Sequence, residues 1–265
     1  DFYTVLILGR DTGGGGNTDT MLLASYDVTN QKATVMSIPR DTMVNVPWDI
    51  KRINSVYNYY GGGEKGIKAL YKEIAQLVGF EPDYQVVVEW DAVGEIVKAM
   101  GGVYYDVPRN MNYDDPYQDL HIHYTKGQHH LNGQQAMEVV RFRHNNDGSG
   151  YGSEDIGRMQ TQQNFLKAVA QQTLTLSNVD KVGEFAKIFQ QYVDTDLSLG
   201  NLAWLGKEAI SMGVDKISFS TLPNEWRSPY IYLDPDATLE LVNQYLNPYV
   251  EDRTCLLYTS DAADD

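Results

Sequence analysis

The chain opens with three apolar runs that decide its fold class: TVLILG at residues 4–9, TMLLASYD at 20–27 and KATVMSIP at 32–39. All three are rich in aliphatic and β-branched residues, and their length of about six residues is that of an average strand. Short apolar runs of this kind are typical of strands buried within a sheet. The start of the chain therefore predicts a sheet.

Helical and strand-like segments alternate through the rest of the chain. The run EKGIKALYKEIAQLVG at 64–79 has apolar residues at helical spacing and ends at a glycine, a common helix stop. Further strands are expected at 83–90, 103–108, 120–124 and 216–223, and further helices at 91–102, 131–140, 153–175, 179–193, 199–212 and 236–246. This order predicts an α/β fold, a layered α-β-α sandwich around a central mixed sheet. Because no repeat or linker interrupts it, residues 1–253 are expected to form a single domain.

The composition limits the partners and the setting. The net charge is −15 and the pI is about 4.6, which argues against a nucleic-acid partner bound through bulk charge. No apolar run reaches the roughly 18 residues of a membrane span, and no signal peptide is present. Since the first residues already read as a strand, we expect the chain to be a fragment.

The C-terminal segment TCLLYTSDAADD, residues 254–265, differs from the rest of the chain. It fits no amphipathic period and resembles translated adapter sequence more than protein, so we expect that it is not native. The segment contains Cys255, the only cysteine, and the chain therefore has no internal disulfide.

Two carboxylates flank a glycine-rich loop. Asp11 follows the first expected strand and Asp19 precedes the second, with TGGGGNT at 12–18 between them. Loops at strand ends often build ligand sites in α/β proteins. A magnesium site takes one or two carboxylates, completed by phosphate and water, so the pair is a candidate metal site. The alternative is that Asp19 belongs to a turn and Asp11 is a surface loop residue.

Three of the nine arginines lie close together in VVRFRHNNDGSGYGSEDIGRM, residues 139–159. In an extended chain Arg141 and Arg143 share one side while Phe142 faces the other. Arg158 and Gln162 lie four apart and share a helix face.

The guanidinium fork of arginine fits phosphate oxygens bidentately. Together with Arg40, which follows the third expected strand in SIPRDT, the clustered arginines suit a diphosphate. The alternative is ordinary ion pairing with Asp147, Glu154 and Asp155.

Other patterns are less informative. GGGEKG at 61–66 does not follow a buried strand, and the first glycine-rich loop lacks the Gly-Lys-Ser/Thr of a nucleotide P-loop. His121 and His123 share one side of an expected strand. No cysteine or carboxylate accompanies them at zinc-ligand spacing, so edge-strand polarity accounts for them. No pattern indicates a nucleophilic serine or cysteine.

At these residues the chain resembles the LytR-CpsA-Psr family of cell-wall assembly proteins. The resemblance is collinear over about residues 4–170 and runs through LILGRD, TDTMLLASYD, VMSIPRDTMV, INSVYNYYGG, AMGGVYYDVP, YDDPYQDLHIHYTKGQHHLNGQQAMEVVRFRH and DIGRMQTQQNFL. It implies a phosphotransferase anchored in the cell membrane, on the extracellular face of a Gram-positive-type envelope. The N-terminal anchor would be missing from this chain.

The expected reaction moves an anionic glycopolymer, of teichoic acid or capsule type, from an undecaprenyl-diphosphate carrier. The acceptor is the C6 hydroxyl of N-acetylmuramic acid in peptidoglycan, and hydrolysis of the diphosphate lipid is a side activity. No nucleic-acid partner is implied.

The resemblance also implies residue roles. Asp11 and Asp19 match the magnesium-site carboxylates, with Mg²⁺ or Mn²⁺ as cofactor, and the expected base is Asp11 or Asp19. The catalytic set is completed by Arg40, Arg141 and Arg143. The diphosphate and head group would be bound by Arg40, Arg141, Arg143, Arg158 and Gln162. The candidates for an apolar tunnel that holds the lipid are Leu70, Ile74, Val86, Val88, Ile96, Val97 and Phe165, all of which also suit a plain core.

Two positions depart from the family pattern. Asn17 and Thr161 stand where the family often has arginine, and Asn17 removes one expected phosphate contact. Two other functions therefore stay open: a protein that binds polyprenyl-diphosphate lipid, or a pyrophosphatase without transfer. A transcriptional regulator would need a basic groove-reading helix, which the sequence does not supply.

Overall fold

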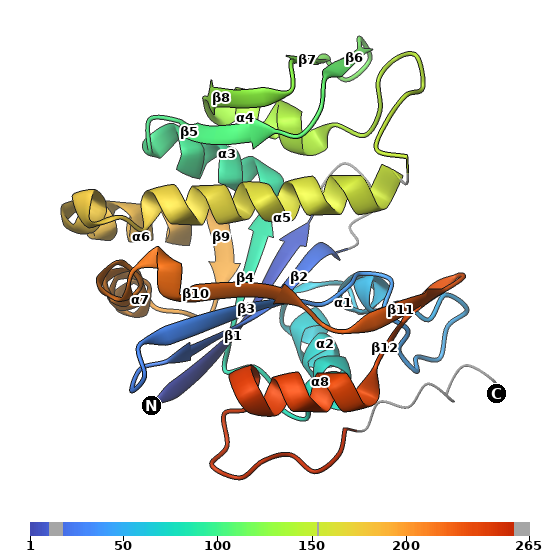
Figure 1. Cartoon of the computed structure of the whole chain (residues 1–265), viewed down its shortest axis with the longest axis vertical. Coiled ribbons are helices and arrows are strands. Elements are labelled where there is room, and N and C mark those ends of the chain that lie inside the picture. The colour runs from blue at the N-terminus through green and yellow to red at the C-terminus, as the bar shows by residue number, and fades with distance from the viewer. Residues whose placement is uncertain (11–17, 153, 257–265) are drawn as a thin grey trace. The chain divides into compact units, whose positions relative to one another are not determined.

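The computed structural model describes residues 1–10, 18–152 and 154–256, with the backbone alone for 154–156. The described chain forms two compact units. The first unit comprises Asp1–Val88, Asp194–Leu197 and Asp215–Asp265, and the second comprises Glu89–Val193 and Ser198–Val214. Each unit therefore joins segments that are far apart in the sequence, as the colours of Figure 1 show.

A mixed sheet organises the first unit. Within the described residues its strands lie in the order β10-β3-β2-β1-β4-β9. β1 pairs antiparallel with β2 and β2 with β3, whereas β10 runs parallel to β3. The strands are β1 (Phe2–Arg10), β2 (Thr18–Asp27), β3 (Lys32–Ser37), β4 (Tyr84–Glu89), β9 (Val193–Thr195) and β10 (Ile217–Thr221). The late strand expected at 216–223 thus joins the sheet that the first three strands begin.

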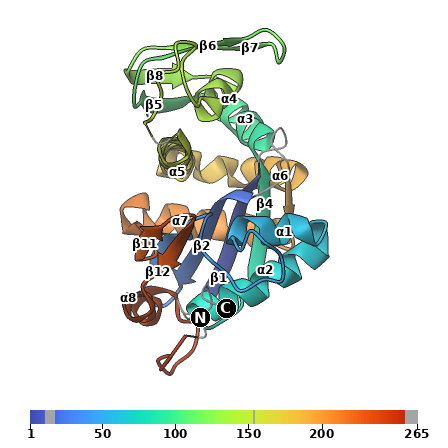
Figure 2. The same ribbon diagram turned by 90° about the vertical axis from the view of Figure 1, so that its right-hand side faces the viewer.

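Helix α2 (Gly63–Val78) packs its apolar face on this sheet (Figure 2). Leu70 and Ile74 are fully buried in one core with Leu6 and Leu8, which lie on the same face of β1 because they are two residues apart. α2 ends at Gly79, whose φ of +84° is the left-handed conformation that glycine adopts without a Cβ penalty. The remaining elements of the unit are η1 (Ile53–Ser55), α1 (Val56–Tyr59), η3 (Val214–Lys216), β11 (Asn224–Arg227), β12 (Tyr230–Leu233), α8 (Pro235–Leu241) and η4 (Val242–Leu246).

In its described residues, the second unit combines helices with two strand pairs. β5 (Val103–Val107) pairs with β8 (Gly127–Leu131), and the hairpin of β6 (Met111–Asp115) and β7 (Leu120–Tyr124) is inserted between them in sequence. The helical elements are α3 (Trp90–Ala99), α4 (Gly133–Arg141), α5 (Glu154–Thr173), η2 (Leu176–Lys181), α6 (Val182–Tyr192) and α7 (Leu199–Met212). The sequence predicted β5 and β7 but not β6 and β8, because these two are mostly polar.

The start of α4 is fixed by two local features. Asn132 and Gln135 form a capping box, with Gln135 N–H donating to Asn132 Oδ1 at 3.0 Å and Asn132 N–H to Gln135 Oε1 at 2.9 Å. A Cβ on Gly133 would lie 2.3 Å from the carbonyl oxygen of Gly94 in α3. Only glycine at position 133 therefore allows the two helices to approach this closely.

The structure confirms the α/β class and the central mixed sheet. No helix in the described ranges is both long and apolar enough to cross a membrane. The apolar tunnel and the single domain over 1–253 stay predictions, and most of the final segment, 257–265, lies outside the described residues.

Candidate functional site

Asp19 and Arg40 form a buried ion pair at one end of the sheet. Asp19 is the second residue of β2, and Arg40 follows β3. Arg40 Nη1 donates to Asp19 Oδ1 at 2.5 Å, with the two side chains 15% and 9% exposed. β2 and β3 are antiparallel neighbours, so the start of β2 and the end of β3 lie at the same end of the sheet. The fold thereby unites two residues that the sequence singled out separately.

A second carboxylate and a second guanidinium extend this pair. Asp41 Oδ1 lies 3.7 Å from Arg40 Nε and 3.4 Å from Arg52 Nη1. Arg52 Nη2 also donates to the carbonyl of Pro229 at 2.8 Å, and the N–H of Ile231 donates to the carbonyl of Asp41 at 2.9 Å. The hairpin of β11 and β12 therefore holds the loop after β3 in place.

Arg10 adds a third guanidinium to this end of the sheet. It is the last residue of β1 and pairs in register with Thr18, next to Asp19. Its Cζ lies 5.1 Å from the ring centre of Tyr57, a cation–π distance. The guanidiniums of Arg10, Arg40 and Arg52 thus lie at this end of the sheet with the carboxylates of Asp19 and Asp41, which gives three cations against two anions among these five side chains.

The expected metal site is described only in part. Asp11 lies outside the described residues, whereas Asp19 contributes a buried carboxylate beside the guanidiniums. Carboxylate oxygen is the donor that Mg²⁺ and Mn²⁺ prefer, so Asp19 fits as one protein ligand of such an ion. The metal site stays a prediction.

In the second unit, Arg141 is the last residue of α4, and Arg143 follows it after the C-cap residue Phe142. Both are exposed, while Phe142 between them is only 1% exposed, as the alternation predicted. Arg141 Nη2 pairs with Asp91 Oδ1 at 2.6 Å. The alternative partner Asp147 instead accepts hydrogen bonds from the N–H and hydroxyl of Ser149, at 2.9 and 2.5 Å.

Arg158 and Gln162 are both buried on α5, with 4% and 3% exposure. Gln162 Nε2 donates to the carbonyl of Val140 at 3.3 Å, which ties α5 to the last turn of α4 beside Arg141. The shared helix face that their spacing predicted is therefore confirmed. A guanidinium keeps its charge even when buried, so Arg158 is a fixed cation in this unit.

Thr161, one of the two departures from the family pattern, is buried on α5 like Arg158 and Gln162. Its hydroxyl donates to Tyr151 Oη at 2.9 Å, and Tyr105 Oη donates to its carbonyl at 3.2 Å. Arg109 Cζ lies 5.5 Å from the ring centre of Tyr151. Burial raises the pKa of the Tyr105 and Tyr151 hydroxyls, so both stay protonated at neutral pH.

Sequence reasoning missed three arginines: Arg10, Arg52 and Arg109. Arg10 and Arg109 each stand at the end of an expected strand, and that position was a usable signal. Arg52 follows no predicted element, and only the fold reveals its contact with Asp41.

The tunnel candidates are distributed over both units. Leu70 and Ile74 are core residues of the first unit, Val86 and Val88 lie on β4, and Ile96 and Val97 lie on α3. Phe165 of α5 is fully buried and contacts Tyr105 edge to face at 5.3 Å between ring centres. A tunnel that these residues line stays a prediction.

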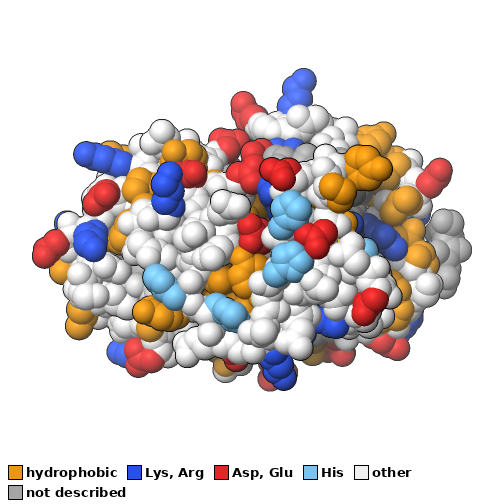
Figure 3. All heavy atoms as spheres, turned by 90° about the horizontal axis from the view of Figure 1, so that it is seen from above, with side chains coloured by type: hydrophobic (Ala, Val, Ile, Leu, Met, Phe, Trp, Pro, Cys, Tyr) orange, Lys and Arg blue, Asp and Glu red, His pale blue; other side chains and the backbone are white. Residues whose placement is uncertain are grey.

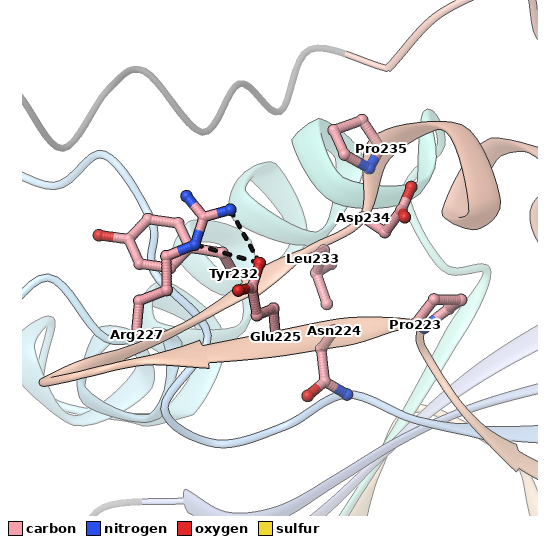
Figure 4. A pocket seen from close by; sticks show the side chains of 8 residues that line it. All are labelled: Pro223, Asn224, Glu225, Arg227, Tyr232, Leu233, Asp234 and Pro235. Carbon is pink, nitrogen blue, oxygen red and sulfur yellow. Dashed lines mark hydrogen bonds and ion pairs between the residues drawn. The ribbon is translucent and has the colours of Figure 1, made fainter.

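A pocket of ≈ 320 Å³ lies on the β11–β12 hairpin (Figure 4). Arg227 and Glu225 form an ion pair within it at 2.8 Å, next to Tyr232, and Asp234 lines the other end of the pocket. None of the predicted site residues lines it.

The fold is that of an α/β protein, and the arginines at one end of its sheet, Arg10, Arg40 and Arg52, form a candidate site for an anionic ligand. The chain belongs to the LytR_cpsA_psr family, whose model matches residues 1–246. It is 26% identical over 249 residues to Regulatory protein MsrR of Staphylococcus aureus (strain Mu50), covering 92% of this chain and 71% of that protein.

A second relative is the polyisoprenyl-teichoic acid–peptidoglycan teichoic acid transferase TagV of Bacillus subtilis (strain 168). It is 26% identical over 277 residues, which cover 98% of this chain and 66% of TagV. The crystal structure of B. subtilis TagV superposes with a TM-score of 0.72 at 22% identity, over 92% of this chain and 95% of that one. The structure of TagT bound to LI-WTA gives a TM-score of 0.67 at 22% identity, over 92% and 89%.

Proposed function

We propose that this protein transfers an anionic glycopolymer, of teichoic acid or capsule type, from an undecaprenyl-diphosphate carrier to peptidoglycan. Membership of the LytR_cpsA_psr family and the likeness to the transferase TagV support the transfer. The observation that carries the proposal is that Arg10 and Arg52 lie at the same end of the sheet as the buried Asp19–Arg40 pair. A chain with a net charge of −15 needs such a local group to hold a diphosphate.

The proposed reaction is an in-line displacement at the phosphorus that carries the glycopolymer. The C6 hydroxyl of N-acetylmuramic acid attacks that phosphorus, and the bond from phosphorus to the bridging diphosphate oxygen breaks. Undecaprenyl phosphate departs, and the hydroxyl proton passes to a carboxylate or to solvent. The product is a phosphodiester between glycopolymer and peptidoglycan.

The arginines neutralise the charge that develops during this step. Arg40 is already oriented by Asp19 and Asp41, so its guanidinium needs little reorganisation when the diphosphate binds. Arg141, Arg143, Arg158 and Gln162 are proposed to bind the phosphates and the head group. Mg²⁺ or Mn²⁺ held by Asp11 and Asp19 would add positive charge at the diphosphate oxygens.

The proposed location is the extracellular face of a Gram-positive-type cell membrane, where carrier lipid and peptidoglycan meet. An N-terminal anchor outside this sequence would hold the protein there. The transferase relatives support an envelope function.

The second candidate is a polyprenyl-diphosphate binding protein or a pyrophosphatase without transfer. Asn17, at a position where an arginine contact to phosphate was expected, favours it. A nucleic-acid-binding regulator is disfavoured by the acidic chain, although the relative MsrR is named a regulatory protein.

The test is turnover of a polyprenyl-diphosphate sugar with Mg²⁺, with and without peptidoglycan fragments. Arg40→Ala and Arg40→Lys are compared with Arg227→Ala, which breaks an exposed ion pair on the β11–β12 hairpin. We expect Arg40→Ala to lower the rate about 10²- to 10³-fold and Arg227→Ala to leave it unchanged. Lipid binding without turnover by the folded wild type would favour the binding protein instead.

A further inference from the structure

The β6–β7 hairpin gathers polar side chains on one face. In its antiparallel register Asn112 lies opposite His123, and Asp114 lies opposite His121. Positions two apart on a strand face the same way, so all four side chains project from one side of the hairpin. Figure 3 shows histidine and acidic side chains grouped on this face of the molecule. The carboxylate between the two histidines comes from the opposite strand, where Asp114 lies across from His121.

The two imidazoles converge on a single carboxylate. Asp114 Oδ1 lies 2.6 Å from His121 Nδ1 and 3.0 Å from His123 Nε2. One ligand atom from each residue lies within 4.8 Å of the other two. The side chains are 45 to 57% exposed, so an ion can reach them from solvent.

In each histidine, the ring nitrogen that does not contact Asp114 has another oxygen nearby. His123 Nδ1 lies 2.7 Å from Asn112 Oδ1, and His121 Nε2 lies 3.5 Å from Asp119 Oδ1. An N–H on each of these nitrogens would leave the other nitrogen with its lone pair toward Asp114. Metal-binding histidines characteristically have this second hydrogen bond, which fixes the tautomer and the ring orientation.

We propose that Asp114, His121 and His123 bind a divalent transition-metal ion of the Zn²⁺ class, with solvent completing the coordination. Two imidazoles and one carboxylate are a donor set for Zn²⁺ rather than for Mg²⁺, which prefers oxygen alone. At metal–ligand distances of about 2.0–2.2 Å, tetrahedral ligand atoms lie about 3.3–3.6 Å apart. The present contacts of 2.6 and 3.0 Å reach that spacing through small side-chain shifts. This site shares no residue with the Asp11 and Asp19 set proposed for the transferase.

Metal binding here would also stiffen the loop that follows Arg143. The N–H groups of Asn112 and Asp114 donate to Asn145 Oδ1 at 2.6 Å and to Asn146 Oδ1 at 2.7 Å. The N–H of Asn146 returns a bond to the carbonyl of Asn112 at 3.1 Å. β6 thus lies between β7 and this loop, and an ion that joins the two strands orders the backbone that the loop is bound to.

The test is isothermal titration of the untagged, chelator-treated protein with Zn²⁺. We expect one ion per chain for the wild type and for the control His130→Ala, an exposed histidine on β8 whose ring centre lies 4.5 Å from that of Tyr104. His121→Ala and His123→Ala are expected to weaken binding at least 10-fold, and Asp119→Asn to weaken it less. Circular dichroism checks that each variant folds.

A second readout uses Co²⁺, whose visible absorption reports its coordination. A tetrahedral-type spectrum is expected in the wild type and in His130→Ala and is expected to be absent in His123→Ala. Either of two results would overturn the proposal: no stoichiometric binding by the folded wild type, or equal binding by His123→Ala and His130→Ala. Neither readout depends on transferase activity.

Discussion

Two arginine–aspartate pairs in this protein have nearly the same length but opposite surroundings. Arg40 and Asp19 meet at 2.5 Å with side chains 15% and 9% exposed, whereas Arg141 and Asp91 meet at 2.6 Å with 43% and 65% exposed. Distance alone does not distinguish them. Burial does, because a buried charge that loses its partner has no water to replace it, while an exposed charge does. The buried pair is therefore a fixed part of the structure, and the exposed arginine is free to exchange its partner for a ligand.

The largest expected effect follows from breaking the buried pair. Arg40→Ala leaves the Asp19 carboxylate without this partner and should lower the free energy of unfolding by about 3–5 kcal/mol. The double variant Asp19→Ala, Arg40→Ala should cost less than the sum of the two single changes. Urea denaturation of the set measures this coupling. Simple additivity would contradict the account of the buried pair.

A medium effect is expected for a buried amide. Gln162→Leu removes the hydrogen bond from Nε2 to the carbonyl of Val140. It should lower the free energy of unfolding by about 1–3 kcal/mol, because this carbonyl in the last turn of α4 loses its side-chain donor. Gln172 is the matched control on α5, since its amide bonds both backbone groups of Tyr104 in an exposed setting. If Gln172→Leu cost as much as Gln162→Leu in urea denaturation, burial would not be the deciding factor.

A smaller effect is expected for the exposed pair. Asp91→Ala should change the free energy of unfolding by about 0–1 kcal/mol, and the difference should shrink in 1 M salt. Thermal melts of wild type and variant at low and high salt measure it. A loss comparable to that of Arg40→Ala would remove the contrast between the two pairs.

The smallest effect concerns Glu73, a half-buried carboxylate on α2. Within the described residues its Oε2 has no hydrogen bond, and burial raises the pKa of its carboxyl. The folded state then binds the proton more tightly than the unfolded state. Protonation of Glu73 therefore increases the free energy of unfolding as pH falls through its folded pKa, and this contribution disappears as pH rises. Glu73→Gln should raise the free energy of unfolding by about 0.5 kcal/mol or less at pH 7. The gain should disappear at pH 4, which denaturation at both pH values tests.

The fold was largely predictable because its strands bury aliphatic residues in short runs. β1, β2 and β3 show this pattern directly, as does α2 with its helical spacing. β6 and β8 were missed because strands such as GQHHL carry polar side chains on both faces. Periodicity reports burial, so a strand without a buried face leaves little signal.

The candidate site was predictable by residue type but not by arrangement. Arg40 and Asp19 were named separately, and only the antiparallel register of β2 and β3 shows that they pair. Arg52 carried no local signal, since its contact with Asp41 depends on the loop after β3. The carboxylate that joins His121 and His123 was missed for the same reason: it comes from the opposite strand.

The most direct test of the proposed function is mass spectrometry of the product made from a polyprenyl-diphosphate glycan, Mg²⁺ and peptidoglycan fragments. The account predicts a phosphodiester that joins the glycan to the C6 oxygen of N-acetylmuramic acid, with one undecaprenyl phosphate released per bond formed. Release of glycan phosphate to water alone, with peptidoglycan present and unmodified, would contradict transfer and identify a pyrophosphatase.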